Sequence, residues 1–251
     1  MTIEVILLLF SIALLAGFID TLAGGGGLLT LPALLLTGMS PVQAIATNKL
    51  QAVIGTATAT TMMFRKRKVT FSHVWPLMLM AFIGSAFGAL LVLSINSDWL
   101  EPAVPFILVV IGVYFLISPK AKDRQEINGK QDTHGYRLYQ FVVVPIVGMY
   151  DGFFGPGTGA FFTASGTSVA KMPFLQATAI AKTLNFSTNF SALILFVIAG
   201  KMIWMAGFVM MFGQFLGAWL GSHMLFTLPV KLIRLLAASM CFLMVIKLVW
   251  F

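Results

Sequence analysis

Apolar runs of about the length needed to cross a lipid bilayer recur along almost the whole chain. A helix that spans the hydrocarbon needs about 20 mainly apolar residues. The runs lie at residues 3–22, 28–37, 41–64, 72–95, 100–117, 138–154, 159–169, 173–198, 203–226 and 229–250. A bilayer admits only helices and closed barrels as spanning structures. The pattern therefore predicts an all-α integral membrane protein with about ten hydrophobic segments.

The composition excludes an ordinary soluble domain. Of the 251 residues, 59% are hydrophobic and only 10% are charged, whereas soluble domains carry about a quarter charged residues. Such a surface in water would present large apolar patches and aggregate. The net charge of +8 comes mostly from short connections between apolar runs, as the positive-inside rule describes. We therefore expect the lipid bilayer, and no nucleic acid, as a partner.

Two basic connections set the predicted orientation. Residues 65–68 (Arg-Lys-Arg-Lys) and the polar linker 119–137 should be cytoplasmic, with Asp98 and Glu101 on the other side. The runs 28–37 and 159–169 are too short to span about 30 Å at about 1.5 Å per residue. Either each joins a glycine-rich break and crosses, which places both termini outside, or each is re-entrant on one side.

Motifs recur in the same order in the two halves of the chain. Residues 17–20 (Gly-Phe-Ile-Asp) match 148–151 (Gly-Met-Tyr-Asp) at an offset of 131 (148 − 17), and Lys49 meets Lys182 at 133 (182 − 49). Glycines four residues apart, at 84 and 88, match 213 and 217, and we expect these to be packing surfaces.

This recurrence predicts two homologous five-segment repeats. The first covers 1–118, the linker covers 119–137, and the second covers 138–251. An odd number of crossings per unit makes the copies inverted, which we expect, whereas one re-entrant element makes them parallel. Inverted repeats are common in transporters, with the substrate site near the midplane.

Four charged residues lie deep inside the apolar runs, at matched positions: Asp20, Lys49, Asp151 and Lys182. A charge at a helix centre costs about 2.5–3.5 kcal/mol on insertion scales, so it usually faces a partner or a cavity. One interpretation has the lysines bind an anion while Asp20 or Asp151 couples an ion. The other has the aspartates cap the short helices or neutralise the lysines. The sequence leaves both open.

A glycine-rich break and a short helix follow each aspartate, at 24–27 and 155–159. Free N–H groups and the dipole at a helix N-terminus attract anions, although glycines also serve close helix packing. Asn48 and Asn185 flank the lysines and could hydrogen-bond an oxyanion or a neighbouring helix. The substrate-binding candidates are Lys49, Lys182, Asn48, Asn185, Gly24, Gly25, Gly26, Gly155 and Gly157.

The chain shows no signature of catalysis. It lacks the G-x-x-x-x-G-K-[ST] nucleotide motif, its one cysteine has no nearby histidine, and its three histidines are scattered. We expect neither an enzyme nor a bound metal or cofactor. The remaining function classes are a secondary transporter for small anions, a passive anion channel and, third, a membrane scaffold protein.

The motifs resemble those of a known family. Residues 17–27 (Gly-Phe-Ile-Asp-x-x-x-Gly-Gly-Gly-Gly), residues 41–49 (Pro-Val-Gln-Ala-x-x-Thr-Asn-Lys) and their second copies are similar to the sulfite exporter TauE/SafE family, in its YfcA-like branch. The resemblance implies a multi-pass permease of the bacterial cytoplasmic membrane for sulfite, thiosulfate or organosulfonates. Protons are the expected coupling ion of alternating access, and a homo-oligomer is compatible with this reading. Pro156 and Thr158 interrupt the second glycine run, which makes that anion cradle less complete.

Overall fold

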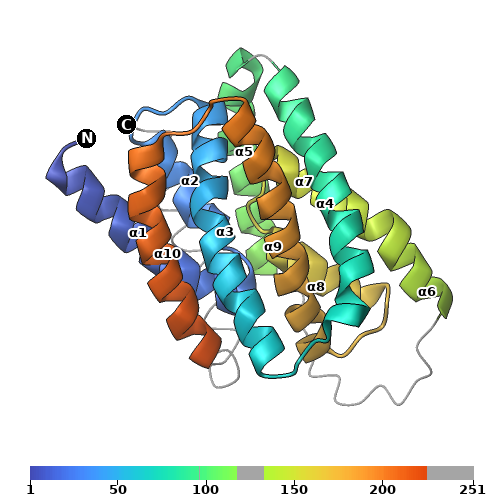
Figure 1. The fold of residues 1–251 in the computed structure, drawn as a ribbon. Coiled ribbons are helices and arrows are strands. Elements are labelled where there is room, and N and C mark those ends of the chain that lie inside the picture. The colour runs from blue at the N-terminus through green and yellow to red at the C-terminus, as the bar shows by residue number, and fades with distance from the viewer. Residues whose placement is uncertain (96, 118–132, 225–251) are drawn as a thin grey trace.

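The computed structural model describes residues 1–95, 97–117 and 133–224, and helices are the regular structure in these ranges (Figure 1). The elements are α1 (Ile3–Ala23), α2 (Gly27–Leu35), α3 (Pro41–Arg65), α4 (Phe71–Ser94), α5 (Ser97–Ile117), α6 (Thr133–Leu138), the π-helical turn η1 (Tyr139–Val143), α7 (Val144–Phe153), α8 (Thr158–Ser168), α9 (Phe174–Ile198) and α10 (Trp204–Met224). The predicted segment 229–250 and most of the predicted linker lie outside the described residues.

The outward faces of the long helices are apolar. Four described helices, α1, α4, α9 and α10, are long and apolar enough to cross a membrane. Large side chains such as Leu7, Phe87 and Phe212 are 62%, 61% and 70% exposed. Exposed apolar surface of this extent is unfavourable in water and suits lipid. The predicted all-α character and membrane environment therefore agree with the described part of the chain.

The sixth predicted segment begins earlier than expected. Helix α6 starts at Thr133 rather than at residue 138, and it continues through η1 into α7 without a break. Gly135 is buried, and the ring of Tyr136 lies 5.9 Å from that of His73 on α4. These contacts give the last residues of the predicted linker packed neighbours, which is why they join the helix.

The position at which α3 begins follows from the local sequence. The hydroxyl of Ser40 accepts a hydrogen bond from the backbone N–H of Gln43 at 3.4 Å, and the side chain of Gln43 accepts one from the N–H of Ser40 at 3.2 Å. Pro41 occupies the first helical position, where its missing N–H costs nothing. This capping box separates α3 sharply from the short helix α2.

Matched segments of the two halves run in opposite directions. Figure 1 shows α3 and α9 side by side and antiparallel, and these two helices are in contact. Helix α2 leads back toward the end of the bundle where α1 begins, and α8 does the same after α7 from the other end. This is the arrangement that an inverted duplication would give. The duplication and the count of ten segments stay predictions.

Glycines bring pairs of helices from different halves into backbone contact. Helix α1 packs along α10, and α7 packs along α4. A Cβ added at Gly84 or Gly88 would overlap the carbonyl oxygens of Pro145 or Met149. One added at Gly213 or Gly217 would likewise overlap the carbonyl oxygens of two residues in α1. The predicted role of these glycines as packing surfaces is confirmed.

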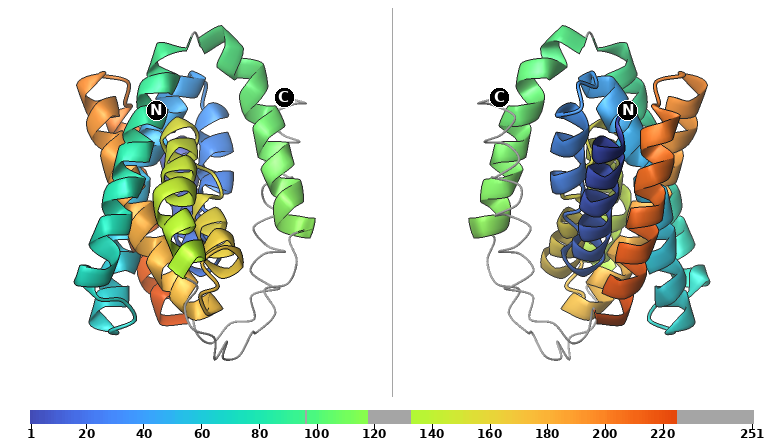
Figure 2. Two further views of the ribbon diagram at one scale, coloured as in Figure 1. Left: turned by 90° about the vertical axis from the view of Figure 1, so that its right-hand side faces the viewer. Right: turned by 90° about the vertical axis from the view of Figure 1, so that its left-hand side faces the viewer.

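Helices α3 and α9 carry the polar middle of the molecule. The buried apolar side chains form two clusters, and α3 contributes Leu50 to one and Met63 to the other. Helix α9 likewise contributes Leu184 to one cluster and Ala192 to the other. The buried polar residues of α3 lie between positions 47 and 60, and those of α9 between positions 178 and 191. Figure 2 shows α5 apart on one flank, where it contacts α2 and α3.

We predict that Gly88→Ala destabilises the fold by about 1–3 kcal/mol, the usual cost of overpacking a tight contact. The added methyl group would force α4 away from α7 at the carbonyl of Met149. Thermal unfolding of the purified protein in detergent measures the effect. Leu90→Ala, at a position of α4 that is 49% exposed, is the control and should unfold at nearly the wild-type temperature. An unchanged unfolding temperature in Gly88→Ala would contradict the close contact.

Candidate functional site

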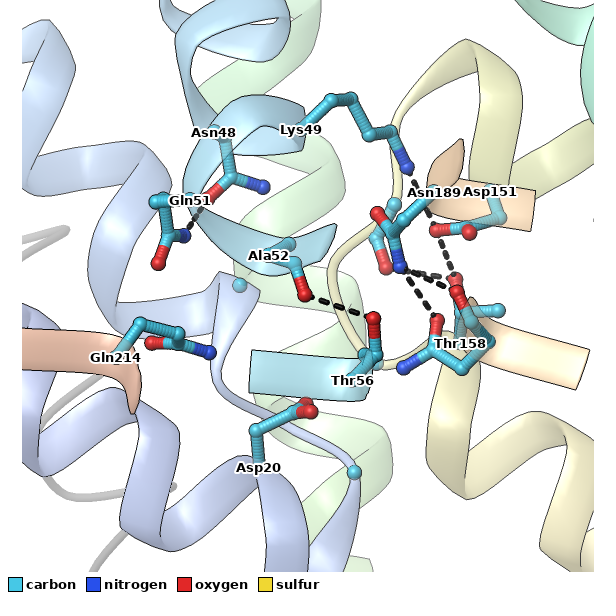
Figure 3. Close-up of a pocket in the computed structure, with 15 residues that line it drawn as sticks. Asp20, Asn48, Lys49, Gln51, Ala52, Thr56, Asp151, Thr158, Asn189 and Gln214 are labelled. Atoms are coloured by element: carbon cyan, nitrogen blue, oxygen red, sulfur yellow. Dashed lines mark hydrogen bonds and ion pairs between the residues drawn. The ribbon is translucent and has the colours of Figure 1, made fainter. Parts of the chain in front are cut away.

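A small polar cavity lies at the mid-length of α3 and α9, where both glycine-rich breaks approach them. It encloses about 340 Å³ of space, counted to its open mouth. Figure 3 shows the side chains that surround it. Its lining consists of Asp20, Gly24, Gly27, Asn48, Lys49, Gln51, Ala52, Thr56, Asp151, Gly155, Gly157, Thr158, Asn185, Asn189 and Gln214.

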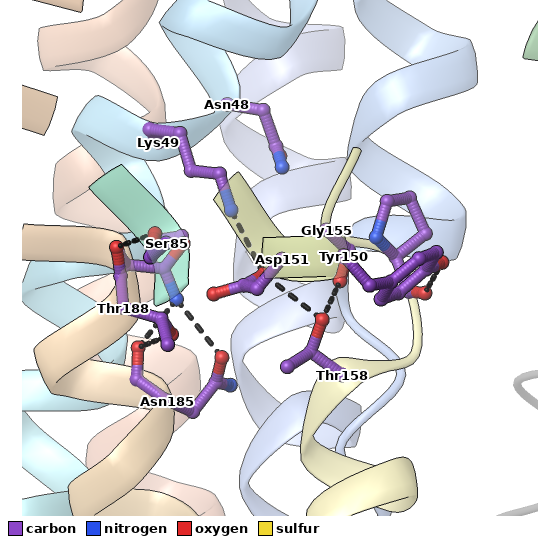
Figure 4. A network of polar contacts seen from close by, with 12 residues as sticks. Asn48, Lys49, Ser85, Tyr150, Asp151, Gly155, Thr158, Asn185 and Thr188 are labelled. Atoms are coloured by element: carbon purple, nitrogen blue, oxygen red, sulfur yellow. Dashed lines mark hydrogen bonds and ion pairs between the residues drawn. The ribbon is translucent and has the colours of Figure 1, made fainter. Parts of the chain in front are cut away.

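An ion pair between the two halves of the chain stands in this cavity. The ammonium of Lys49 on α3 donates to Oδ1 of Asp151 on α7 at 2.8 Å, and the two side chains are 1% and 2% exposed (Figure 4). Gly155 has φ +102°, and a Cβ there would lie 2.8 Å from the Lys49 nitrogen. Glycine is thus needed both for the turn and for the approach of the lysine.

Asp151 has one oxygen with partners and one without. The hydroxyl of Thr158, at the start of α8, donates to Asp151 Oδ1 at 2.9 Å and also lies 2.6 Å from the carbonyl oxygen of Gly155. Oδ2 of Asp151 is buried and has no hydrogen-bond partner among the described residues. The threonine that interrupts the second glycine run therefore holds the carboxylate, and one acceptor oxygen stays available.

The ammonium of Lys182 binds a backbone carbonyl near the C-terminal end of α1, not a carboxylate. It donates to the backbone carbonyl of Asp20, which also accepts the N–H of Gly24 at 2.7 Å. A cation at a helix C-terminus is favoured by the helix dipole. Lys182 is 1% exposed and is not among the residues that line the cavity.

The carboxylate of Asp20 is engaged at the first break. Its Oδ1 accepts a hydrogen bond from the N–H of Gly26 at 3.0 Å, which is the capping contact of the structural interpretation. Asp20 still lines the cavity. The two lysines therefore contact the matched aspartates of the opposite half, one through a carboxylate and one through a carbonyl.

The two glycine-rich breaks pack against each other. Gly24 has φ +76°, and a Cβ there would lie 2.5 Å from the backbone nitrogen of Ala160 on α8. Of the five candidate glycines, the structure brings Gly24, Gly155 and Gly157 to the cavity. Gly25 and Gly26 are not among its lining residues, and the N–H of Gly26 is already bound by Asp20. These two are poorly placed to contact a substrate.

Both candidate asparagines line the cavity with their oxygens already engaged. Oδ1 of Asn48 accepts from Thr30 at 2.5 Å and from Gln51 at 2.7 Å. Oδ1 of Asn185 accepts from Asn189 at 3.0 Å. With the oxygens fixed by these donors, the amide NH₂ groups are left as donors for a ligand. This geometry suits an oxyanion.

The sequence did not single out every residue of the cavity. Thr56 and Gln214 line it, and neither was a candidate. Gln214 is an uncharged amide inside the otherwise apolar middle of α10. An isolated amide at membrane depth is a signal that could have found it. Thr56 offers no such signal, because its hydroxyl bonds the carbonyl of Ala52 within its own helix.

Comparisons with known proteins place the chain among membrane transporters. The model of the family described as sulfite exporter TauE/SafE matches residues 9–248. A probable membrane transporter protein of Haemophilus influenzae is 41% identical over 248 residues, which cover 99% of this chain and 96% of that protein.

Two further relatives carry similar names. The probable membrane transporter protein YfcA of Escherichia coli is 45% identical over 229 residues, covering 90% of this chain and 82% of the relative. A probable membrane transporter protein of a Sinorhizobium species is 40% identical over 230 residues, covering 90% and 85%. No solved structure matches the chain. The names of these relatives agree with the expectation that the chain is not an enzyme.

We predict that Lys49→Ala lowers the free energy of unfolding by about 3–5 kcal/mol, because it leaves Asp151 charged and buried without its partner. The double variant Lys49→Ala/Asp151→Ala should recover much of that loss. Thermal unfolding of the two single variants and the double variant in detergent forms the mutant cycle. Losses that simply add would contradict a direct interaction between the two side chains.

Proposed function

Because the chain belongs to the TauE/SafE family of sulfite exporters and is a multi-pass membrane transporter, we propose that it moves small anions by ion-coupled alternating access. The proposed cargo is sulfite, thiosulfate or an organosulfonate, and the proposed location is the bacterial cytoplasmic membrane. The coupling ion in this proposal is the proton.

The observation that carries the proposal is the Lys49–Asp151 pair, enclosed at 1% and 2% exposure in a cavity lined by amides and glycines. A buried ion pair contributes little net stability compared with apolar packing, because the desolvation of both charges offsets their attraction. Ionisable residues at membrane depth are accordingly functional by default. Lys49 supplies the cation and Asn48 and Asn185 supply neutral donors, which together favour an oxyanion.

The proposed coupling step exchanges the partner of Lys49. The incoming anion takes the place of Asp151 at the Lys49 ammonium, and one proton binds the released carboxylate. For a monovalent anion, such as hydrogensulfite or a monosulfonate, the charge of the site is then unchanged, because one negative charge and one positive charge have entered; a dianion such as thiosulfate needs two protons for the same balance. In a low-dielectric interior this balance matters, since the interaction of unit charges grows as the dielectric constant falls. Oδ2 of Asp151, which lacks a partner among the described residues, is the natural acceptor of that proton.

Asp151 suits this role better than Asp20. The carboxylate of Asp20 is held by a backbone N–H of the glycine-rich break, and Lys182 contacts its carbonyl rather than its carboxylate. A carbonyl does not take up a proton at physiological pH. Lys182 therefore acts in the proposal through the position of α1 and through its charge.

The opposite direction of matched helices favours a carrier over a channel. Helices α3 and α9 run antiparallel and meet at the cavity, as in transporters in which one half moves against the other around a fixed site. A carrier saturates and shows counter-flow, whereas a passive anion channel shows neither. Counter-flow of labelled sulfite in proteoliposomes distinguishes them.

We predict that sulfite and thiosulfate flux into proteoliposomes depends on both buried lysines. Lys49→Ala and Lys182→Ala, compared at equal amounts of folded protein, should each lower flux by about tenfold or more. Lys49→Ala removes a hydrogen bond from a charged group to the anion, which contributes about 1.5–3 kcal/mol. Lys182→Ala releases the end of α1 at the carbonyl of Asp20. Lys201→Ala, at an exposed lysine between α9 and α10, is the matched control and should transport normally. If both variants transport as well as the control, the proposed anion site is wrong.

We predict that Asp151→Asn uncouples anion movement from protons. In the wild type, acid on the side from which the anion enters should speed its flux, because proton binding to Asp151 releases Lys49. In Asp151→Asn the remaining flux should be indifferent to an imposed pH gradient. Anion flux with inside-acid and outside-acid vesicles measures both.

Asp20→Asn serves as the comparison for this test. The amide can still accept the N–H of Gly26 through its oxygen, so the break keeps its cap. The response to the pH gradient should therefore persist in Asp20→Asn. If the response to the pH gradient is lost in Asp20→Asn and kept in Asp151→Asn, the coupling residue is Asp20 and the proposal for Asp151 is wrong.

A further inference from the structure

Two amide oxygens of the cavity have no donor. Oε1 of Gln51 on α3 and Oε1 of Gln214 on α10 are buried and have no hydrogen-bond partner among the described residues. Their side chains are 1% and 2% exposed. Figure 3 shows both on the side of the cavity away from the Lys49–Asp151 pair. The cavity thus has the Lys49–Asp151 pair on one side and the two unpaired amide oxygens of Gln51 and Gln214 on another.

A hydrogen bond orients the amide of Gln51, and close packing confines that of Gln214. The Nε2 group of Gln51 donates to Oδ1 of Asn48 at 2.7 Å, so its oxygen cannot exchange places with the nitrogen without losing that bond. Gln214 lies against Gly55, where an added Cβ would be 2.5 Å from its Cγ and 2.7 Å from its Nε2. Gly55 therefore gives the glutamine the room it occupies beside α3.

Unpaired acceptors matter when a ligand fills the cavity. A ligand that displaces water from these oxygens must bring hydrogen-bond donors of its own or leave the oxygens unmet. One buried acceptor left without a donor costs about a tenfold loss of affinity or more. A site that hydrogen-bonds a substrate N–H or O–H discriminates strongly against the analogue that lacks it.

We propose that the substrate is a small oxyanion that carries its own N–H or O–H donor. Its anionic oxygens lie against Lys49 and the amides of Asn48 and Asn185, and its donor reaches Gln51 and Gln214. This inference rests on the proposed anion site and specifies its substrate class. Within the proposed cargo it favours hydrogensulfite and organosulfonates that bear an N–H or O–H group over thiosulfate and simple alkylsulfonates. Neither glutamine titrates, so the preference does not depend on the protonation of Asp151.

Sulfamate and methanesulfonate form the test pair. Both are tetrahedral monovalent anions with three sulfur-bound oxygens, and they differ in an NH₂ group against a CH₃ group. The first measurement is inhibition of sulfite flux in proteoliposomes by each anion. The second is the protection of the purified protein against thermal unfolding by each anion, which does not require transport. Sulfamate should act at about tenfold lower concentration than methanesulfonate in both.

Gln214→Met tests the residue. The variant keeps the length of the side chain and removes the acceptor, so the preference for sulfamate should fall severalfold while the effect of methanesulfonate changes little. Gln176→Met makes the same change at a half-buried position of α9 outside the cavity and should keep the wild-type preference. Gly55→Ala, which crowds Gln214, should resemble Gln214→Met. The wild-type comparison stands even if a variant fails to fold.

The outcomes separate this inference from the proposed function. Equal effects of the two anions, a stronger effect of methanesulfonate, or no effect of either on sulfite flux and thermal unfolding would overturn the inference and leave anion transport standing. Absence of flux for sulfite, thiosulfate and both probes would overturn the proposed function. If flux is absent but sulfamate alone protects the protein against thermal unfolding, the result would still support the inference that Gln51 and Gln214 accept a donor from the ligand.

Discussion

The contact between Lys49 and Asp151 organises the centre of this protein. Two unit charges at 2.8 Å and 1–2% exposure are tolerable at membrane depth because they neutralise each other. Their closeness requires α3 to meet the C-terminal end of α7, and it requires a glycine at 155 because a Cβ would collide with the ammonium. Thr158, the first residue of α8, then binds the same carboxylate oxygen. One ion pair thus positions three elements from the two halves of the chain.

The non-helical backbone around this pair also needs to be surrounded by protein. Non-helical backbone at membrane depth is stable only where protein or a cavity surrounds it. Here the two breaks lie against each other, with Gly24 beside the start of α8, and the carbonyl of Asp20 takes the ammonium of Lys182 and an amide N–H. Residues 24–26 and 156–159 of the two breaks are buried, as this constraint requires. The cavity lies beside these two breaks.

The sequence predicted the classes of element and most of the candidate residues, because these depend on local chemistry. Apolar runs, the glycine breaks and the four membrane-embedded charges can all be recognised without neighbours. The partners of those charges could not be recognised, since the pairing of Lys49 with Asp151 joins positions 102 residues apart. Gln214 could have been recognised as an isolated amide in an apolar helix, but its place beside Gly55 of another helix could not. The start of α6 at Thr133 depends on packing against His73, which a polar stretch does not reveal.

The matched halves are chemically unequal at the position that decides their roles. An offset of 131 places Gly27 opposite Thr158 (27 + 131 = 158). In the second half the threonine hydroxyl binds the carboxylate of Asp151, whereas in the first half a backbone N–H binds that of Asp20. A hydroxyl can rotate, and it can accept a hydrogen bond as well as donate one; a backbone N–H within a turn can only donate. A carboxyl group that gains a proton on one oxygen still accepts through the other, so Asp151 and Asp20 both keep their donor, a rotatable one at Asp151 and a fixed one at Asp20. The glycine-to-threonine difference thus gives the carboxylate of Asp151 a side-chain donor and leaves that of Asp20 with a backbone donor, and the unpaired Oδ2 of Asp151 is the feature that supports the proposed proton exchange there.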